Sequence, residues 1–166
     1  MKKIFCVFLS YFLLTCGQPT SNGTSEGIFA IYLLEDSTLS ASDVYSLSIE
    51  SLILSEKAFF SANELISYSW PSHSFELNDQ KRAEYENFAL NSGSTSGIPF
   101  IVTVGEERIY FGTFWWAYSS SLPPACAVID AIGPLPYRIQ LVTGAIDERN
   151  DLRIYNSLKS SGVLEL

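Results

Sequence analysis

Apolar residues along this chain occur mostly in short uninterrupted runs, which predict buried strands. Residues 28–34 form one such run, and the two acids that follow it are typical of the end of a central strand. Residues 98–104 and 108–111 form two more, and the glycine-containing segment 105–107 between them has the length of a hairpin turn. Further strands are predicted in the other apolar or alternating segments, at residues 48–54, 72–77, 125–129 and 137–142.

Helical periodicity is confined to two longer segments. Asn78 precedes an amphipathic pattern over residues 80–90 and is expected to cap it. Asn150 precedes a second pattern over residues 151–161, which Gly162 is expected to end. Both segments are long enough to form a few helical turns.

Two shorter stretches predict single helical turns. Ser61 and Glu64 have the spacing of a capping box, and residues 40–43 contain a similar capping pattern. Strands therefore outnumber helices, and hairpins outnumber crossovers. This favours an α+β fold with a mainly antiparallel sheet and two or three helices, in a single domain over residues 28–166.

The N-terminus has the pattern of a bacterial secretory signal. Lys2 and Lys3 precede an apolar run at residues 4–14, which is shorter than the roughly 20 residues that a membrane span needs. The cysteine that follows, Cys16, resembles that of the lipobox of bacterial lipoproteins, where the signal is removed and the sulfur receives a diacylglyceryl group. We expect a signal peptide at residues 1–15 and lipidation of Cys16, with palmitate among the acyl chains.

Residues 16–27 are expected to form a lipidated flexible tether, because positions 18–27 hold no apolar side chain. Secretion without lipid and retention of the apolar run as a transmembrane anchor are the alternatives. Gly17 after the cysteine favours the outer membrane, by resemblance to enterobacterial sorting. The sequence thus predicts a protein of the bacterial cell envelope that is bound to a membrane through a lipid anchor.

Cysteine usage and net charge restrict the partners. Cys6 would leave with the signal and Cys16 would carry lipid, so Cys126 remains alone and no intrachain disulfide is expected. The apolar neighbours of Cys126 favour a buried, inert thiol. The formal net charge of −8 would repel DNA, RNA and anionic lipid surfaces, so no nucleic-acid partner is expected.

His73 is the only histidine and lies near Glu76 and Asp79 in the sequence. One histidine without further nitrogen or sulfur ligands cannot complete a zinc site, so neither a metal nor another cofactor is expected. In a strand His73 and Glu76 would point to opposite faces, which favours a structural or surface role for the imidazole. The nucleophile motifs of known hydrolase classes are absent. Catalysis by His73 with Glu76 or Asp79 is left as the alternative, and whether the protein is an enzyme stays open.

The densest aromatic segment, residues 111–118, is a candidate binding surface. Alternation in a strand would place Trp116 and Tyr118 on one face and Trp115 on the other. Core burial is favoured for the set as a whole. Two adjacent tryptophans are nevertheless hard to bury together, so one of Trp115 and Trp116 is expected at the surface, where a large ring serves as a binding hot spot.

The charged segment 147–153 is expected to hold a helix cap and ion pairs between arginines and carboxylates. It lacks the alternating carboxylates and central glycine of an EF-hand calcium loop. The ion pairs and the cap account for these charges without a ligand.

Three motifs in this chain resemble those of a group of uncharacterised bacterial envelope lipoproteins. They are Tyr68-Ser69-Trp70-Pro71-Ser72-His73, the segment 99–104 and the segment 147–154, and the resemblance extends over roughly residues 28–166. Residues 61–129 also resemble the periplasmic head region of the protein-export subunit SecD. That second resemblance implies a fold but not an export role, because the membrane spans of SecD have no counterpart in the predicted elements. The first implies no known activity.

These observations predict a membrane-anchored lipoprotein whose domain is a non-catalytic binding or assembly module of the cell envelope, with an envelope protein as a potential partner. Two alternatives belong to other classes. One is a small envelope hydrolase that uses His73 with a nearby carboxylate. The other is a surface lipoprotein that contacts external macromolecules through Trp115 or Trp116.

Overall fold

The computed structural model of this protein describes residues 27–166. The predicted signal peptide, Cys16 and all of the predicted tether except Gly27 lie outside these residues. The strands are β1 (Phe29–Leu33), β2 (Phe60–Ser61), β3 (Leu65–Ser69), β4 (Ser74–Leu77), β5 (Ile98–Val104), β6 (Glu107–Trp115), β7 (Ala127–Asp130), β8 (Tyr137–Leu141) and β9 (Leu164–Glu165). The helices are α1 (Ala41–Val44), α2 (Asp79–Asn91) and α3 (Leu152–Ser160), with 3-10 turns η1 (Ile49–Ser51) and η2 (Ala62–Glu64).

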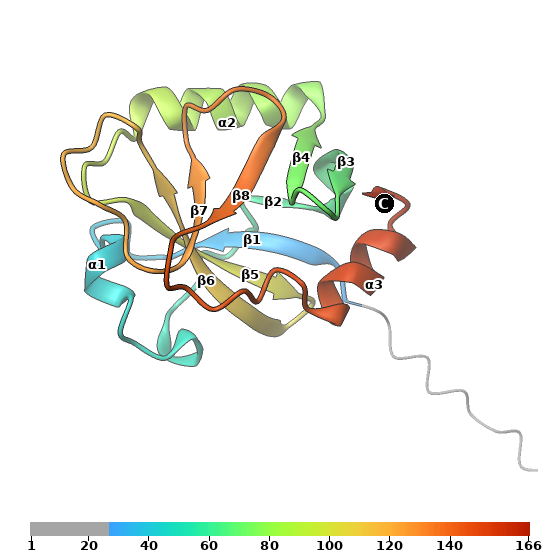
Figure 1. Cartoon of the computed structure of the whole chain (residues 1–166), viewed down its shortest axis with the longest axis horizontal. Helices are drawn as coiled ribbons and strands as arrows, with labels where there is room; N and C mark the ends of the chain where they lie inside the picture. The colour runs from blue at the N-terminus through green and yellow to red at the C-terminus, as the bar shows by residue number, and fades with distance from the viewer. Residues whose placement is uncertain (1–26) are drawn as a thin grey trace, which may run out of the picture.

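The described strands form one curled sheet in the order β2-β1-β5-β6-β7-β8-β4-β3-β9 (Figure 1). Neighbouring strands are antiparallel except at the β6–β7 and β3–β9 pairs, which are parallel. The predicted hairpin of β5 and β6 is the longest pairing and runs from Ile98↔Phe114 to Val104↔Glu107. The predicted class, a single α+β domain with a mainly antiparallel sheet and two or three helices, is confirmed.

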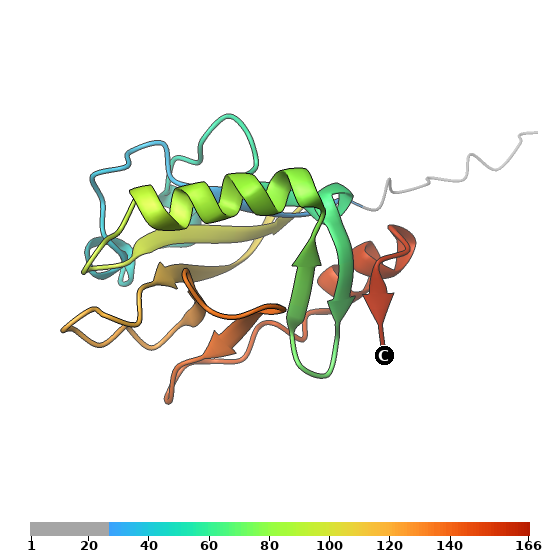
Figure 2. The ribbon, with the colours of Figure 1, turned by 90° about the horizontal axis from the view of Figure 1, so that it is seen from above.

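The main core lies on the concave side of the sheet. Side chains that alternate along the strands meet there, among them Phe100, Phe114 and Ile139, each with no exposed surface. The helix α2 lies across this side along the top of Figure 1, and α3 lies at the end beside β9 (Figure 2). A smaller cluster on the convex side is formed by Leu34, Val44, Leu52 and Ile101.

The helix α2 begins where the sequence predicts. The side chain of Asn78 accepts a hydrogen bond of 2.9 Å from the backbone N–H of Lys81, as expected of an N-cap. Tyr85 and Ala89 are buried against the sheet, and Phe88 packs between Phe59 and Phe114, with ring centroids 4.7 and 5.3 Å away. The aromatic contacts hold α2 on the core.

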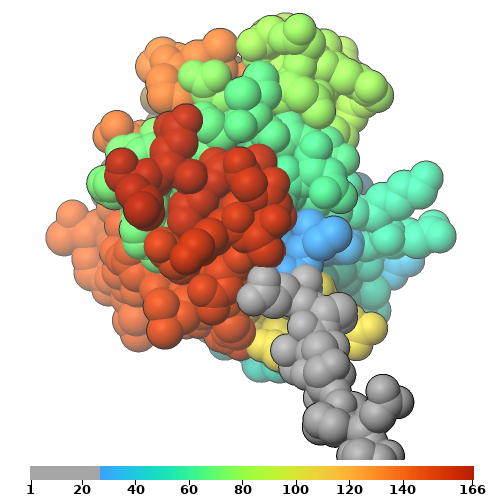
Figure 3. Space-filling model, turned by 90° about the vertical axis from the view of Figure 1, so that its right-hand side faces the viewer, coloured from blue at the N-terminus to red at the C-terminus, as the bar shows by residue number. Residues whose placement is uncertain are grey.

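The helix α3 is capped one residue later than predicted. Asp151, not Asn150, is the N-cap, and its carboxylate accepts from the N–H of Arg153 at 2.8 Å. Ser157 on this helix accepts a buried hydrogen bond of 2.6 Å from the N–H of Phe29, which ties α3 to the first strand. Gly162 follows the helix with a φ of +73°, the left-handed conformation that ends many helices. Figure 3 shows α3 and the C-terminal residues beside β1 on this face.

The segment 48–54 is not the strand that the sequence predicts. It contains η1, and Leu54 makes only an isolated bridge with Leu34. The guanidinium of Arg108 donates to the carbonyls of Ile49 and Leu52, so a side chain takes the place of a neighbouring strand. None of the helices in residues 27–166 is both long and apolar enough to span a bilayer.

Candidate functional site

His73 lies in the turn between β3 and β4, and not in the strand predicted at residues 72–77, which begins at Ser74. Its φ is +51°, in the left-handed region that is uncommon for residues with a side chain, although histidine adopts it more often than most. The ring is only 5% exposed. The turn therefore buries most of His73 next to β3.

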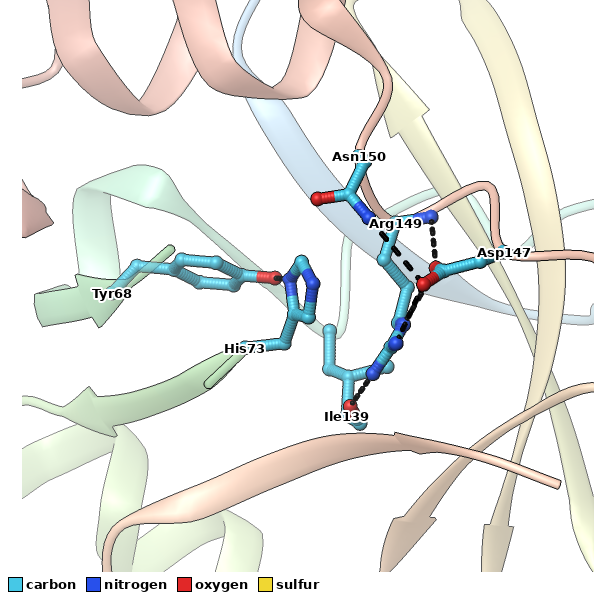
Figure 4. Close-up of polar contacts among 6 residues, drawn as sticks. All are labelled: Tyr68, His73, Ile139, Asp147, Arg149 and Asn150. Carbon is cyan, nitrogen blue, oxygen red and sulfur yellow. Dashed lines mark hydrogen bonds and ion pairs between the residues drawn. The ribbon is translucent and has the colours of Figure 1, made fainter. Parts of the chain in front are cut away.

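The imidazole of His73 is held by Tyr68 and Trp70. The hydroxyl of Tyr68 and Nδ1 of His73 are 3.1 Å apart and share a hydrogen bond (Figure 4). The Trp70 ring contacts the imidazole edge to face, with centroids 5.6 Å apart. Burial lowers the pKa of His73, and the positive charge of Arg149 lowers this pKa further, so the imidazole is neutral at pH 7.

Arg149 reaches this site from the loop before α3. Its Nε and Nη2 each donate to one oxygen of Asp147 at 2.8 Å, and Nη1 donates to the carbonyl of Ile139 at 2.8 Å (Figure 4). The hydrogen bonds from Arg149 lower the pKa of Asp147. A bidentate pair of this kind fixes both side chains more firmly than a single contact. It confirms the ion pairing predicted for this charged segment.

The guanidinium of Arg149 occupies a break in the sheet. The pairing of β4 with β8 ends at Ser74↔Arg138, followed by a last backbone bond of 2.9 Å from Ile139 N–H to the carbonyl of His73. The carbonyl of Ile139 lies beyond that last pair, and Arg149 supplies the donor that a strand would otherwise provide. The chain therefore closes this gap with a side chain.

An open hollow of about 740 Å³ lies outside this gap, and we call it the His73 hollow. Its wall is formed by Trp70, Pro71, Ser72, His73, Arg138, Gln140, Leu141, Asp147, Arg149 and Asn150. Most of these groups are polar. Arg138 is exposed and forms no ion pair with any residue of the described part of the chain.

Arg149 also borders a second cavity, of about 470 Å³, which is lined mostly by apolar residues but exposes polar and apolar surface equally. Tyr45, Leu47 and Ile146 are exposed at its rim. Tyr110 lines it as well, and the Tyr110 hydroxyl is buried without a hydrogen-bond partner among residues 27–166.

The carboxylates that the sequence places beside His73 are not its neighbours. Glu76 is exposed on β4, since Phe75 and Leu77 take the inward positions, and Asp79 forms an ion pair with Arg82 on α2. Within residues 27–166, no hydrogen bond or ion pair joins His73 to either one. The acid that does lie near is Asp147, which contributes to the electrostatics of His73.

The expectation that one of Trp115 and Trp116 is exposed is wrong, because they are 8% and 0% exposed. Trp116 lies under α2, where its indole N–H donates to the carbonyl of Ala89 at 2.9 Å. Trp115 lies against Gly97, where an added Cβ would come within 2.6 Å of the ring. Both faces of the sheet are covered at this point, so adjacent rings are buried on opposite sides. Tyr118, which is 60% exposed, is the one member of the predicted trio at the surface.

The expectations from the sequence also concern Cys126 and the arrangement of potential metal ligands. Cys126 is free and buried, and burial raises the pKa of its thiol to about 12. The described residues contain no group of three or more histidine, cysteine or acidic side chains arranged to hold a metal ion.

Sequence reasoning missed the parts of the site that come from different segments. Tyr68, Asp147 and Arg149 surround His73, and each lies in one of the motifs quoted above, Tyr68–His73 and residues 147–154. The motifs were separate features of the sequence, and the structure brings them together (Figure 4). In the sequence, the only sign of this site was that both motifs contain polar residues with aromatic residues nearby.

Comparisons with protein-family models, with curated proteins and with solved structures found no match. The resemblances to envelope lipoproteins and to the SecD head region therefore stay predictions from the sequence.

Proposed function

We propose that this chain is a lipoprotein of the bacterial cell envelope, anchored to a membrane, most simply the outer membrane, through lipid on Cys16. Its folded domain is a non-catalytic binding module whose ligand site is the His73 hollow. The anchor rests on the N-terminal pattern alone. The binding role is supported by the geometry of the hollow.

The observation that carries the binding role is that Nδ1 of His73 and the carboxylate of Asp147 are each held by another side chain of the site. Nδ1 of His73 is bound to Tyr68, and the carboxylate of Asp147 accepts three hydrogen bonds from Arg149. Hydrolysis by a histidine needs a base that is hydrogen-bonded to a nucleophile and oriented by an acid. Here the same residue types form a fixed wall, which is what recognition of a ligand requires.

The serine hydroxyls at the turn that holds His73 are likewise hydrogen-bonded to one another. Ser72 donates to Ser69 at 2.9 Å and shares a hydrogen bond of 2.7 Å with Ser74. These hydroxyls are positioned by each other and not by His73. The hydrolase alternative with Glu76 or Asp79 loses its acid, and the alternative with Trp115 or Trp116 loses its exposed ring.

The anchor is tested by the intact mass of the protein from its native membranes. We expect a mature chain that begins at Cys16 and carries a diacylglyceryl group. Cys16→Ala should abolish this mass increase and leave the protein in the soluble fraction. A mature wild-type chain without lipid would overturn the anchor.

The binding role is tested by the fate of a ligand. Trp70 lies in the wall of the hollow, so binding should change tryptophan fluorescence, and Trp70→Phe should remove most of that change. The ligand should be recovered intact by mass spectrometry after long incubation. Recovery of cleaved ligand, with cleavage lost in a folded His73→Gln variant, would replace the binding module with the hydrolase.

A further inference from the structure

The charges around the His73 hollow leave one cation without a partner. Arg149 and Asp147 neutralise each other through their paired hydrogen bonds. His73 is uncharged at pH 7 because burial lowers its pKa. Arg138 remains, exposed on β8 and unpaired within the described residues. The hollow is thus locally positive on a chain with a formal net charge of −8.

The unpaired guanidinium of Arg138 favours a carboxylate as its partner. An acidic surface repels anions in general, so an anion would be retained only where an unpaired cation faces it. The planar guanidinium of Arg138 presents parallel N–H groups, which match the two oxygens of a carboxylate. Ser74 lies directly opposite Arg138 in the β4–β8 register, and Ser72 is bonded to Ser74, so hydroxyls flank the cation.

One aromatic ring is fixed beside these polar groups. Trp70 contacts Tyr155 edge to face at 5.1 Å and an angle of 81°, in addition to its contact with His73. A half-buried ring held from two sides is rigid, and a rigid aromatic face packs well against the C–H face of a sugar ring. Gln140 and Asn150 add amide groups that suit sugar hydroxyls.

The size of the hollow agrees with this chemistry. Its volume of about 740 Å³ falls within the range of roughly 300–1,000 Å³ that is common for small-ligand sites. The wall is more polar than that of most sites for apolar ligands.

We propose that the His73 hollow binds a sugar ring that carries a carboxylate, with Arg138 holding the carboxylate and Trp70 lying against the ring. The inference rests on the proposed binding function and specifies its ligand class. The carboxylate can come from a uronic acid or from a lactyl ether, as in muramic acid.

The test compares sugars that differ only by the acid group, using the lipid-anchored protein in detergent. N-acetylmuramic acid is paired with N-acetylglucosamine, and glucuronate with glucose, and binding is followed by tryptophan fluorescence and saturation-transfer NMR. We expect at least one acidic sugar to bind tenfold or more tightly than its neutral partner. The pair that shows the difference identifies the source of the carboxylate.

Substitutions then show which residues cause the preference for acidic over neutral sugars. Arg138→Gln should remove the tenfold preference, whereas Lys57→Gln, which removes one charge from an exposed loop, should retain it. Trp70→Phe should weaken the binding of acidic and neutral sugars alike. All variants should keep the circular dichroism spectrum and unfolding midpoint close to those of the wild type.

Equal affinity for acidic and neutral sugars, or an unchanged preference in Arg138→Gln, would overturn the carboxylate inference while leaving a binding module in place. Failure of all four sugars to bind would also overturn it. Cleavage of a bound sugar would instead overturn the proposed function itself.

Discussion

The hydroxyl of Tyr68 lies 3.1 Å from Nδ1 of His73, and this contact joins the end of β3 to the turn that leads into β4. Both groups are buried, and burial raises the pKa of Tyr68 so that its phenol stays protonated. The hydrogen bond therefore persists over the whole range of pH in which the imidazole is neutral. It positions the only histidine of the chain beside Arg149.

Removal of the Tyr68 hydroxyl should destabilise the domain. In Tyr68→Phe the buried Nδ1 of His73 loses its partner, which costs about 1–3 kcal/mol. The free energy of unfolding from denaturant titration measures this loss. Tyr45→Phe is the control, because that ring is 47% exposed, and it should change stability by less than about 0.5 kcal/mol. Equal effects of the two variants would contradict a structural role for the Tyr68–His73 bond.

Stability should fall as the pH is lowered from 7.5 to 5.5. The pKa of His73 is lower in the folded protein than the ordinary value of 6.5, so in this window the unfolded chain binds more protons than the folded one. The free energy of unfolding therefore rises with pH through the window. Carboxylates with lowered pKa values, such as Asp147, act at more acidic pH.

The histidine contribution is isolated by His73→Asn, because asparagine tolerates the left-handed backbone at this position. The variant should show a flatter dependence of unfolding free energy on pH between 7.5 and 5.5. NMR titration of the single histidine gives its pKa directly. A measured pKa at or above 6.5, or equal slopes in the two proteins, would refute the assignment.

Trp116 should stabilise the end of α2 through its indole N–H. Ala89 carries one of the last four carbonyls of this helix, which have no partner within the helix, and the indole donates to it at 2.9 Å. Trp116→Phe leaves this buried carbonyl unsatisfied and should cost about 1–3 kcal/mol. Faster amide exchange confined to the last turn of α2 is the expected local signature.

Trp115→Phe is the matched comparison for that variant, because no described hydrogen bond uses the Trp115 indole. It should lower the unfolding free energy by less than Trp116→Phe. Truncation of either ring to alanine should be strongly destabilising, about 3–5 kcal/mol, since both are buried. A larger loss from Trp115→Phe would show that the indole bond of Trp116 matters little.

The thiol of Cys126 should be inert in the folded protein. With its pKa raised to about 12 by burial, its thiolate fraction at pH 8 is roughly a thousandfold below that of an ordinary cysteine. Alkylation followed by peptide mapping, which separates Cys126 from other cysteines, should show slow labelling that becomes fast in denaturant. Rapid labelling of the native protein would mean that the second cavity admits reagents to the sulfur.

The local elements of this fold follow from residues that are close in the sequence. The cap of α2 at Asn78, the capping box of Ser61 with Glu64 and the hairpin turn at Gly105 were all predictable. Each depends on contacts within a few positions, which the sequence displays directly. The segment at residues 48–54 failed because its apolar pattern fits a strand, whereas Arg108 from a distant strand supplies its hydrogen bonds.

By itself the sequence determined the two longer helices, the central hairpin, the class of the fold and the presence of a single histidine near an aromatic pair. Only the tertiary structure decided which acid lies beside that histidine, because Glu76 and Asp79 are its neighbours in the chain but face elsewhere. The curl of the sheet and the break beyond the Ser74↔Arg138 pair admit Arg149 and Asp147 from the loop before α3. The tertiary structure likewise decided that both Trp115 and Trp116 are buried, because burial on opposite faces requires a cover on each side of β6.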